Sequence, residues 1–245
     1  MLESVLLIII TLIAYFVKGI TGFGNTLIVN SLFNLLKENR FTTPIDLLLG
    51  IPTNSYMAWR ERRHISLKIV IPLSCVVIIG AIPGILMLKV GGERILKSFL
   101  GLVLIGIAVE MMIKKPDNNS EKKQSSYIIW IVGLFSGVLM GLYGIGALLA
   151  AYINRTTINR SEYRANLCFI FLIENLFRLI GYCYFGLINT QMMPFAFLLL
   201  PAAIVGLFIG IKADKKISDK MVKNLVIILL IISGATLIGI NRFGL

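Results

Sequence analysis

The chain has 245 residues, of which 57% are hydrophobic and only 15% charged, and its formal net charge is +12. Soluble domains carry about 25% charged residues and alternate apolar with polar positions along their elements. The composition therefore excludes an ordinary soluble domain and predicts an all-α integral membrane protein. Most basic residues lie in short gaps between apolar runs, a pattern typical of cytoplasmic loops rather than of nucleic-acid binding.

Apolar runs of about 20 residues recur along the chain, which is the length of a membrane-spanning helix. We predict a polytopic helical bundle of about eight full spans. These spans cover residues 3–19, 43–59, 68–89, 94–113, 126–143, 165–181, 192–211 and 222–240. Two shorter apolar pieces, 25–36 and 147–154, cannot cross a hydrocarbon core of about 30 Å without help from neighbouring polar residues. Each of them either re-enters the membrane or crosses it with that help.

Polar residues mark three helix starts. Thr43-Pro44-Ile45-Asp46 has the pattern of an N-cap followed by a first-turn proline and a capping acid. Asn159-Arg160-Ser161-Glu162 shows the same spacing from cap to acid, and Ser218-Asp219 opens the last predicted span in a similar way. We therefore interpret Asp46 as a capping residue.

The two halves of the chain resemble each other. Residues 19–24 and 141–146 both have the pattern GxxGxG and lie 122 positions apart. Further matched positions, at offsets of 122 or 126, are Pro72 with Pro194, Gly80 with Gly206, and Gly84 with Gly210. We therefore predict two related halves, 1–113 and 126–245, joined by a cytoplasmic linker over 114–125.

Loop charges indicate that the halves are inverted. The loop over 60–68 carries four Lys or Arg residues, whereas its counterpart over 181–191 carries none. The turn at 89–93 has one lysine, whereas its counterpart over 212–220 has four. Because positive loops stay on the cytoplasmic side, corresponding loops face opposite sides of the membrane. This orientation predicts both termini outside.

The GxxGxG segments differ from a dinucleotide-binding fingerprint because they lie inside apolar runs and follow no predicted strand. One interpretation is close packing of helices through small residues, which Gly80, Gly84, Gly206 and Gly210 also fit. The other is a break in the helix that exposes backbone N–H groups and a positive dipole end. Two such breaks facing each other near the membrane midplane favour an anion site.

Charged and polar residues inside the spans are candidates for that site. Lys18 either attracts the anion or extends toward the membrane interface. Glu174 and Arg178 are spaced for an ion pair on one helix, and Arg178 also suits a planar oxyanion. The predicted substrate-binding residues are Lys18, Thr21, Gly22, Gly24, Asn25, Asn54, Tyr143, Gly144, Gly146, Asn175 and Arg178.

Two blocks, Lys18 to Leu27 and Ser136 to Ala147, resemble the paired glycine-rich segments of the TauE/SafE sulfite exporter family. The basic stretch Arg160 to Arg164, which an alanine follows, also fits the second half of that family. The resemblance covers essentially the whole chain. It implies transport of sulfite, sulfoacetate or a related product of organosulfonate breakdown.

We therefore expect a secondary transporter of a small sulfur-containing anion in the cytoplasmic membrane, coupled to H⁺ or Na⁺, with oligomers possible. A passive anion channel and a membrane assembly factor without a substrate are the alternatives. We expect no enzyme activity, catalytic residue, metal site, cofactor or nucleic-acid partner, because no catalytic, zinc-binding or nucleotide-binding motif occurs in the sequence.

Overall fold

The computed structural model describes residues 2–33, 37–90, 126–157, 159–214 and 216–218, together with short helical pieces between 101 and 113 and between 221 and 239. Every regular element within these ranges is helical. The elements are α1 (Leu2–Thr21), α2 (Asn25–Phe33), α3 (Asn39–Arg60), the 3₁₀ turn η1 (Arg62–His64), α4 (Leu67–Val90), α6 (Ser126–Tyr143), α7 (Ala147–Thr156), α8 (Arg160–Tyr184) and α9 (Met192–Asp214).

Four of these helices are long and apolar enough to cross a membrane, namely most of α1 and all of α4, α8 and α9. α6 contains a shorter apolar helix, Ile129–Tyr143, while α3 is long but more polar. The helices follow the predicted spans up to 89 and from 126 to 211, and α2 and α7 are the predicted short pieces. The predicted spans 94–113 and 222–240 and the linker 114–125 fall largely or wholly outside the described residues.

The polarity of the bundle is the reverse of that of a soluble protein. Large apolar side chains are exposed along the outer faces of α1, α4, α6 and α9, as at Phe197, which is 71% exposed. Polar and charged side chains are buried, and α8 alone buries Arg164, Glu174 and Arg178. Exposed apolar side chains on several helices, around a polar interior, fit contact with lipid.

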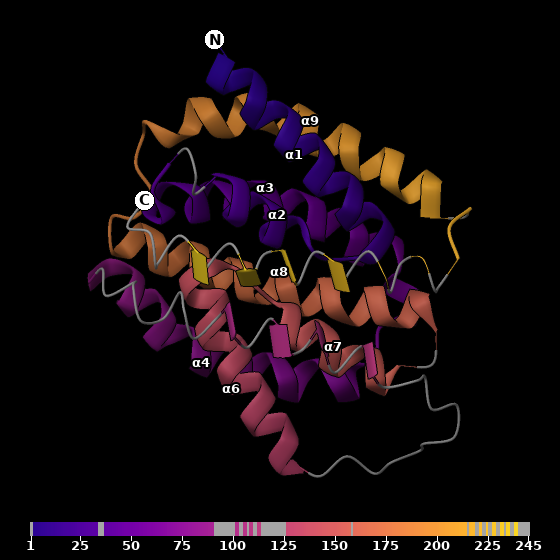
Figure 1. Ribbon diagram of the computed structural model, residues 1–245. Coiled ribbons are helices and arrows are strands. Elements are labelled where there is room, and N and C mark those ends of the chain that lie inside the picture. Colours follow the sequence, from indigo (N-terminus) through magenta and orange to yellow (C-terminus); the bar gives the residue numbers. More distant parts are fainter. Residues whose placement is uncertain are drawn as a thin grey trace.

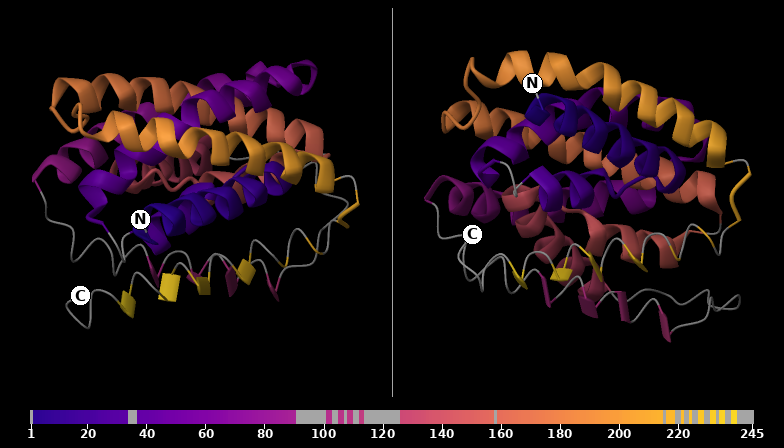
Figure 2. Two further views of the ribbon diagram at one scale, coloured as in Figure 1. Left: turned by 90° about the horizontal axis from the view of Figure 1, so that it is seen from above. Right: turned by 45° about the horizontal axis from the view of Figure 1, so that its top comes forward.

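α1 packs along α9, and α4 packs along α6, on opposite sides of a middle layer formed by α3 and α8 (Figure 1). The two turned views show the same α1–α9 pairing along one side of the bundle (Figure 2). The pairing is reciprocal, because a helix from each half packs against a helix from the other half.

Glycines allow both pairs of helices to approach closely. A Cβ atom at Gly80 would collide with the carbonyl oxygen of Leu134 across the α4–α6 contact. A Cβ atom at Gly206 would collide with the carbonyl oxygen of Leu12 across the α9–α1 contact. The predicted packing role of these small residues is confirmed.

The predicted start of α3 at Thr43 is wrong. The helix begins at Asn39, Pro44 lies inside it, and Asp46 is buried instead of capping. Arg40 provides the physical reason, because its guanidinium donates to the carbonyl oxygens of Leu88 and Lys89 and holds the first turn against the end of α4.

The other predicted helix starts have the expected hydrogen bonds. The Asn159 side chain accepts a hydrogen bond of 2.9 Å from the backbone N–H of Glu162 at the start of α8. The Ser218 hydroxyl accepts one of 3.4 Å from the N–H of Met221. Both bonds satisfy backbone donors that the first turn of a helix leaves free.

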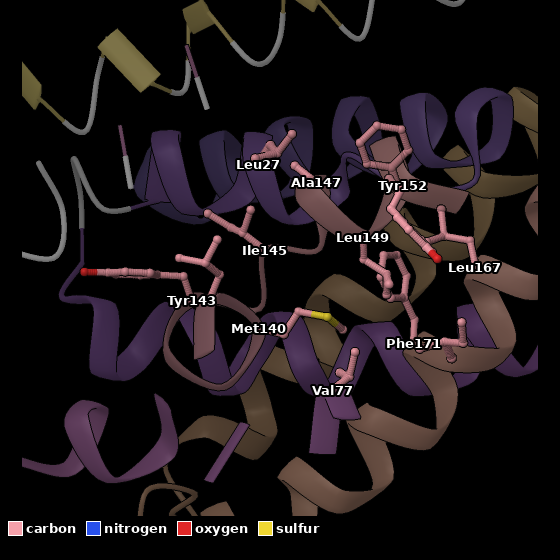
Figure 3. Close-up of a cluster of buried hydrophobic side chains, with 14 of the residues drawn as sticks. Leu27, Val77, Met140, Tyr143, Ile145, Ala147, Leu149, Tyr152, Leu167 and Phe171 are labelled. Carbon is pink, nitrogen blue, oxygen red and sulfur yellow. The ribbon is translucent and has the colours of Figure 1, made fainter. Parts of the chain in front are cut away.

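A buried apolar cluster surrounds the segment between α6 and α7 (Figure 3). Ile145 of this segment and Ala147, the first residue of α7, lie among Leu27 of α2, Val77 of α4 and Phe171 of α8. The cluster fixes a non-helical segment inside the bundle, where irregular backbone is tolerated only if protein or water surrounds it.

Candidate functional site: a cavity between two helix breaks

Both GxxGxG segments interrupt helices, as predicted. α1 ends at Thr21 and α2 begins at Asn25, while α6 ends at Tyr143 and α7 begins at Ala147. Gly22, Gly24 and Gly144 have φ angles of +83°, +92° and +71°, a region that L-residues other than glycine enter at a cost of about 1–2 kcal/mol. The glycines therefore allow the chain to leave one helix and begin the next.

The backbone hydrogen bonds of the two breaks match. The N–H of Gly22 donates to the carbonyl of Lys18, and the N–H of Gly144 donates to that of Met140, both at 2.7 Å. The two donors lie 122 positions apart, and so do the two acceptors, which is the offset of the sequence motif. The two halves thus share backbone geometry at this point as well as glycine spacing.

Different side chains stabilise the two breaks. At the first break, the Thr21 hydroxyl donates to Val17 O and accepts from the N–H of Phe23 at 3.2 Å. At the second, Arg178 donates to Met140 O, and the Tyr182 hydroxyl donates to Gly141 O at 2.9 Å.

α2 connects the first break to the second. Asn30 donates through its side-chain amide to the carbonyl of Tyr143, the last residue of α6. The Thr26 methyl carbon lies 3.1 Å from the point where a Cβ atom of Gly144 would stand. The start of α2 and the second break are therefore in direct contact.

The two breaks border one small cavity. Its wall is made of Lys18, Phe23, Gly24, Asn25, Thr26, Leu27, Asp46, Gly50, Asn54, Met140, Gly144, Ile145, Gly146, Ala147, Phe171, Asn175 and Arg178. The first residues of α2 and of α7, Asn25 and Ala147, both belong to this wall. The positive ends of two helix dipoles therefore meet the same space.

α3 and α8 complete the wall with one face each. From α3 come Asp46, Gly50 and Asn54, and from α8 come Phe171, Asn175 and Arg178. Each set is spaced by three or four residues, so its members lie on a single helix face. This arrangement uses the two most polar long helices of the described chain to line the cavity.

Lys18 is only 1% exposed, and its ammonium donates a hydrogen bond of 3.1 Å to the Thr53 hydroxyl of α3. The ammonium also lies 5.3 Å from the centre of the Tyr15 ring, within cation–π range. Lys18 thus points into the bundle, and the interpretation that it extends to the membrane interface is wrong.

Arg178 is the second cation of the wall. Its Nε lies 3.6 Å from Oε1 of Glu174, which confirms the predicted pair, and its Nη2 donates to Asn175 Oδ1 at 3.0 Å. Because Glu174 and Arg178 are both buried, removing one of them would leave the other charge without a partner in a region that excludes water.

Gly50 lies between two side-chain amides. The Nδ2 atoms of Asn175 and Asn54 are 3.1 Å and 3.9 Å from the position that a Cβ atom of Gly50 would take. Since the oxygen of Asn175 accepts from Arg178, its nitrogen is the part turned toward Gly50. The cavity thus combines amide donors, two cations and two helix N-termini, which is the chemistry of an anion site.

Eight of the predicted site residues line the cavity: Lys18, Gly24, Asn25, Asn54, Gly144, Gly146, Asn175 and Arg178. Thr21, Gly22 and Tyr143 do not belong to the wall. Thr21 is held by its own backbone contacts, Gly22 packs against Arg164, and the Tyr143 ring points away from Phe171 (Figure 3). These three residues shape the breaks without facing the enclosed space.

Sequence reasoning missed Asp46 and Thr26. Asp46 is 3% exposed and accepts hydrogen bonds from the Tyr15 hydroxyl, the Asn25 amide and the Thr26 hydroxyl. Its spacing of four and eight residues from Gly50 and Asn54 was the available signal, because it places all three on one face of α3.

Within the described ranges, no cluster of three or more His, Cys, Asp or Glu side chains is placed to hold a metal ion.

Comparison with curated proteins and with solved structures found no match. The sulfite exporter TauE/SafE family matches residues 7–237, which is nearly the whole chain. With its long apolar helices, this match identifies a multi-pass membrane protein. The chain belongs to the sulfite exporter TauE/SafE family, which indicates a membrane transporter of a sulfur-containing anion.

Proposed function

We propose that the protein is a secondary transporter that moves sulfite, sulfoacetate or a related organosulfonate across the cytoplasmic membrane. The observation that carries this proposal is the single cavity bordered by both glycine breaks and lined by two buried cations. A charged side chain inside a membrane bundle is costly, so two cations on one cavity wall favour a functional role.

In this proposal the anion lies between the N-termini of α2 and α7. Backbone N–H groups and the dipole ends of both helices stabilise its negative charge. Lys18 contributes a compact ammonium, and Arg178 contributes a planar guanidinium suited to two oxygens of one oxyanion. The amides of Asn54 and Asn175 donate to the oxygens that remain.

The cavity also supports a proposed two-half mechanism. We infer that the halves 1–113 and 126–245 are inverted repeats, with the linker 114–125 inside and both termini outside. The reciprocal α1–α9 and α4–α6 contacts and the matched backbone bonds of the breaks support this inference. Movement of one half against the other around the midplane would expose the anion alternately to each side.

Flux measurements on purified protein in liposomes test the proposal. We expect saturable uptake of ³⁵S-labelled sulfite, and faster release of trapped label when unlabelled sulfite or sulfoacetate is added outside. A release rate that does not change when anion is added outside, together with large single-molecule currents, would favour a passive channel instead. Flux equal to that of protein-free liposomes for every sulfur-containing anion tested would contradict transport and favour an assembly role.

A further inference from the structure

Asp46 is a carboxylate buried in the wall of a cavity that otherwise suits an anion. Its Oδ1 accepts from the Tyr15 hydroxyl at 3.3 Å and from the Asn25 amide at 3.0 Å. Its Oδ2 accepts from the Thr26 hydroxyl at 2.6 Å. Three donors from α1 and α2 thus face one carboxylate group of α3.

An ionised Asp46 competes with the proposed substrate. Asn25 and Thr26 are the first two residues of α2, the helix whose N-terminus is proposed to hold the anion. While the carboxylate holds these donors, they are unavailable to a sulfite or sulfonate oxygen. Two negative groups also repel each other strongly where water is excluded.

The charged groups around Asp46 balance when the cavity is empty. α1 contributes Lys18 and the Tyr15 hydroxyl, and α8 contributes the Glu174–Arg178 pair and the Tyr182 hydroxyl. α2 and α6 contain no Asp, Glu, Lys or Arg. The charged residues of α9, which lie at its far end, are Lys212 and Asp214.

An arriving anion disturbs this balance. Lys18 and Arg178 are offset by Asp46 and Glu174, so one added negative charge leaves the enclosed space negative. A net charge in the membrane interior resists the reorientation that a carrier requires. One proton on Asp46 restores the original charge and releases the donors of α2.

Asp46 suits a proton better than a metal cation. A hard cation such as Na⁺ needs several oxygen ligands turned toward it. Here the Asn25 amide and two hydroxyl groups donate hydrogen bonds to the carboxylate, so they point their hydrogen atoms at it and not lone pairs at a cation. A proton needs only one carboxylate oxygen.

We propose that Asp46 is the coupling residue of this transporter, taking up one proton when an anion binds and releasing it when the anion leaves. This inference rests on the proposed transport function. The proton comes from water on the side from which the anion enters and returns to water on the other side. Anion and proton therefore move in the same direction, which the two gradients determine together.

Two assays on Asp46→Asn in liposomes separate coupling from transport. The first measures exchange of ³⁵S-sulfite at equal pH on both sides. The second measures accumulation of ³⁵S-sulfite driven by an inward proton gradient, with a trapped pH-sensitive dye reporting proton entry. Sulfite itself titrates near neutral pH, so the informative quantity is the difference between wild type and variant.

Because an asparagine side chain at this position would mimic a protonated carboxyl, we expect Asp46→Asn to retain exchange while gradient-driven accumulation and proton entry fall by about tenfold or more. Asp46→Glu should restore coupling, and Glu3→Gln, which removes a surface carboxylate paired with Lys37, should behave as wild type. Gradient-driven accumulation by Asp46→Asn equal to that of wild type would overturn the inference.

Loss of exchange together with accumulation in Asp46→Asn, in a variant with wild-type melting behaviour, would also overturn it. If Asp46→Asn fails to fold, Asp46→Glu still tests the proposal, because it keeps a carboxyl group. A correctly folded Asp46→Glu without coupling would contradict the proposal as well. Absence of exchange in the wild-type protein is a separate result, since it contradicts the transport function itself.

Discussion

The two helix breaks have similar backbone conformations but different side chains around them. At the offset of 122 positions, Gly22 corresponds to Gly144, and both take the left-handed conformation. The side chains around them differ, because Lys18, Asn25 and Thr26 correspond to Met140, Ala147 and Leu148. The first break supplies its own cation and polar donors, whereas the second is apolar and obtains a guanidinium from α8.

This difference teaches that duplicated geometry does not require duplicated side chains. The shared element is a pair of helix N-termini, which the glycines make possible in each half. In the proposed site each break has one cation, which comes from the interrupted helix at the first break and from the neighbouring α8 at the second. The two cations should therefore respond differently to substitution.

The largest effect is expected from Arg178→Met at the second break. It removes a donor to Met140 O and leaves Glu174 as an unpaired buried charge, so unfolding free energy should fall by about 3–5 kcal/mol. Loss of a charge-assisted bond to the anion should lower sulfite flux by about 100-fold. Thermal unfolding in detergent and liposome flux measure the two effects. Adding Glu174→Gln should recover stability but not flux, and recovery of both would contradict the assignment.

Lys18→Met at the first break should separate flux from stability. The Thr53 hydroxyl keeps its bonds to Leu49 O and Gly50 O when the ammonium is removed, so this hydroxyl does not lose its only partner. Asp46, whose charge Lys18 offsets, keeps its three hydrogen-bond donors in this variant. We expect sulfite flux to fall by about 10-fold to 100-fold, while the unfolding free energy falls by less than in Arg178→Met. A stability loss as large as that of Arg178→Met would show that the two cations are not different in the way described.

Alanine at the left-handed glycines compares the breaks directly, with Gly186 as the matched control. Gly186 has φ +67° and open space around its Cβ position, so Gly186→Ala should cost only the backbone strain of about 1–2 kcal/mol. At Gly22 and Gly144 the new Cβ would also lie 2.8 Å from Arg164 and Arg178. Both variants should unfold at lower temperature than Gly186→Ala, and only these two should lower flux, by about 10-fold.

The smallest effect on transport is expected from Thr21→Val, which alters the first break outside the cavity. It removes the bonds to Val17 O and from the N–H of Phe23, so unfolding free energy should fall by about 1–2 kcal/mol. The apparent affinity for sulfite, from the concentration dependence of uptake, should stay within about twofold of wild type. A tenfold change in affinity would place Thr21 at the substrate after all.

The breaks were predictable because glycine spacing and apolar context carry a local signal, and the Asn159 cap was predictable for the same reason. Asp46 was misassigned because Thr-Pro-Ile-Asp matches a helix start in isolation. The helix instead begins at Asn39, next to the contact of Arg40 with the end of α4, 48 residues away. Tyr143 lies outside the cavity wall, which spacing could not indicate, because the direction of a side chain at a break depends on packing from other helices.

An experimental density map of the protein with selenite, a heavier analogue of sulfite, would show whether an anion binds between the two helix breaks. The sample would be a detergent-purified protein whose flux selenite has been shown to inhibit competitively. We expect an anomalous selenium peak in the cavity between Asn25 and Ala147, within hydrogen-bonding reach of Lys18 or Arg178. A peak elsewhere in the bundle, with this cavity free of selenium, would contradict the proposed site.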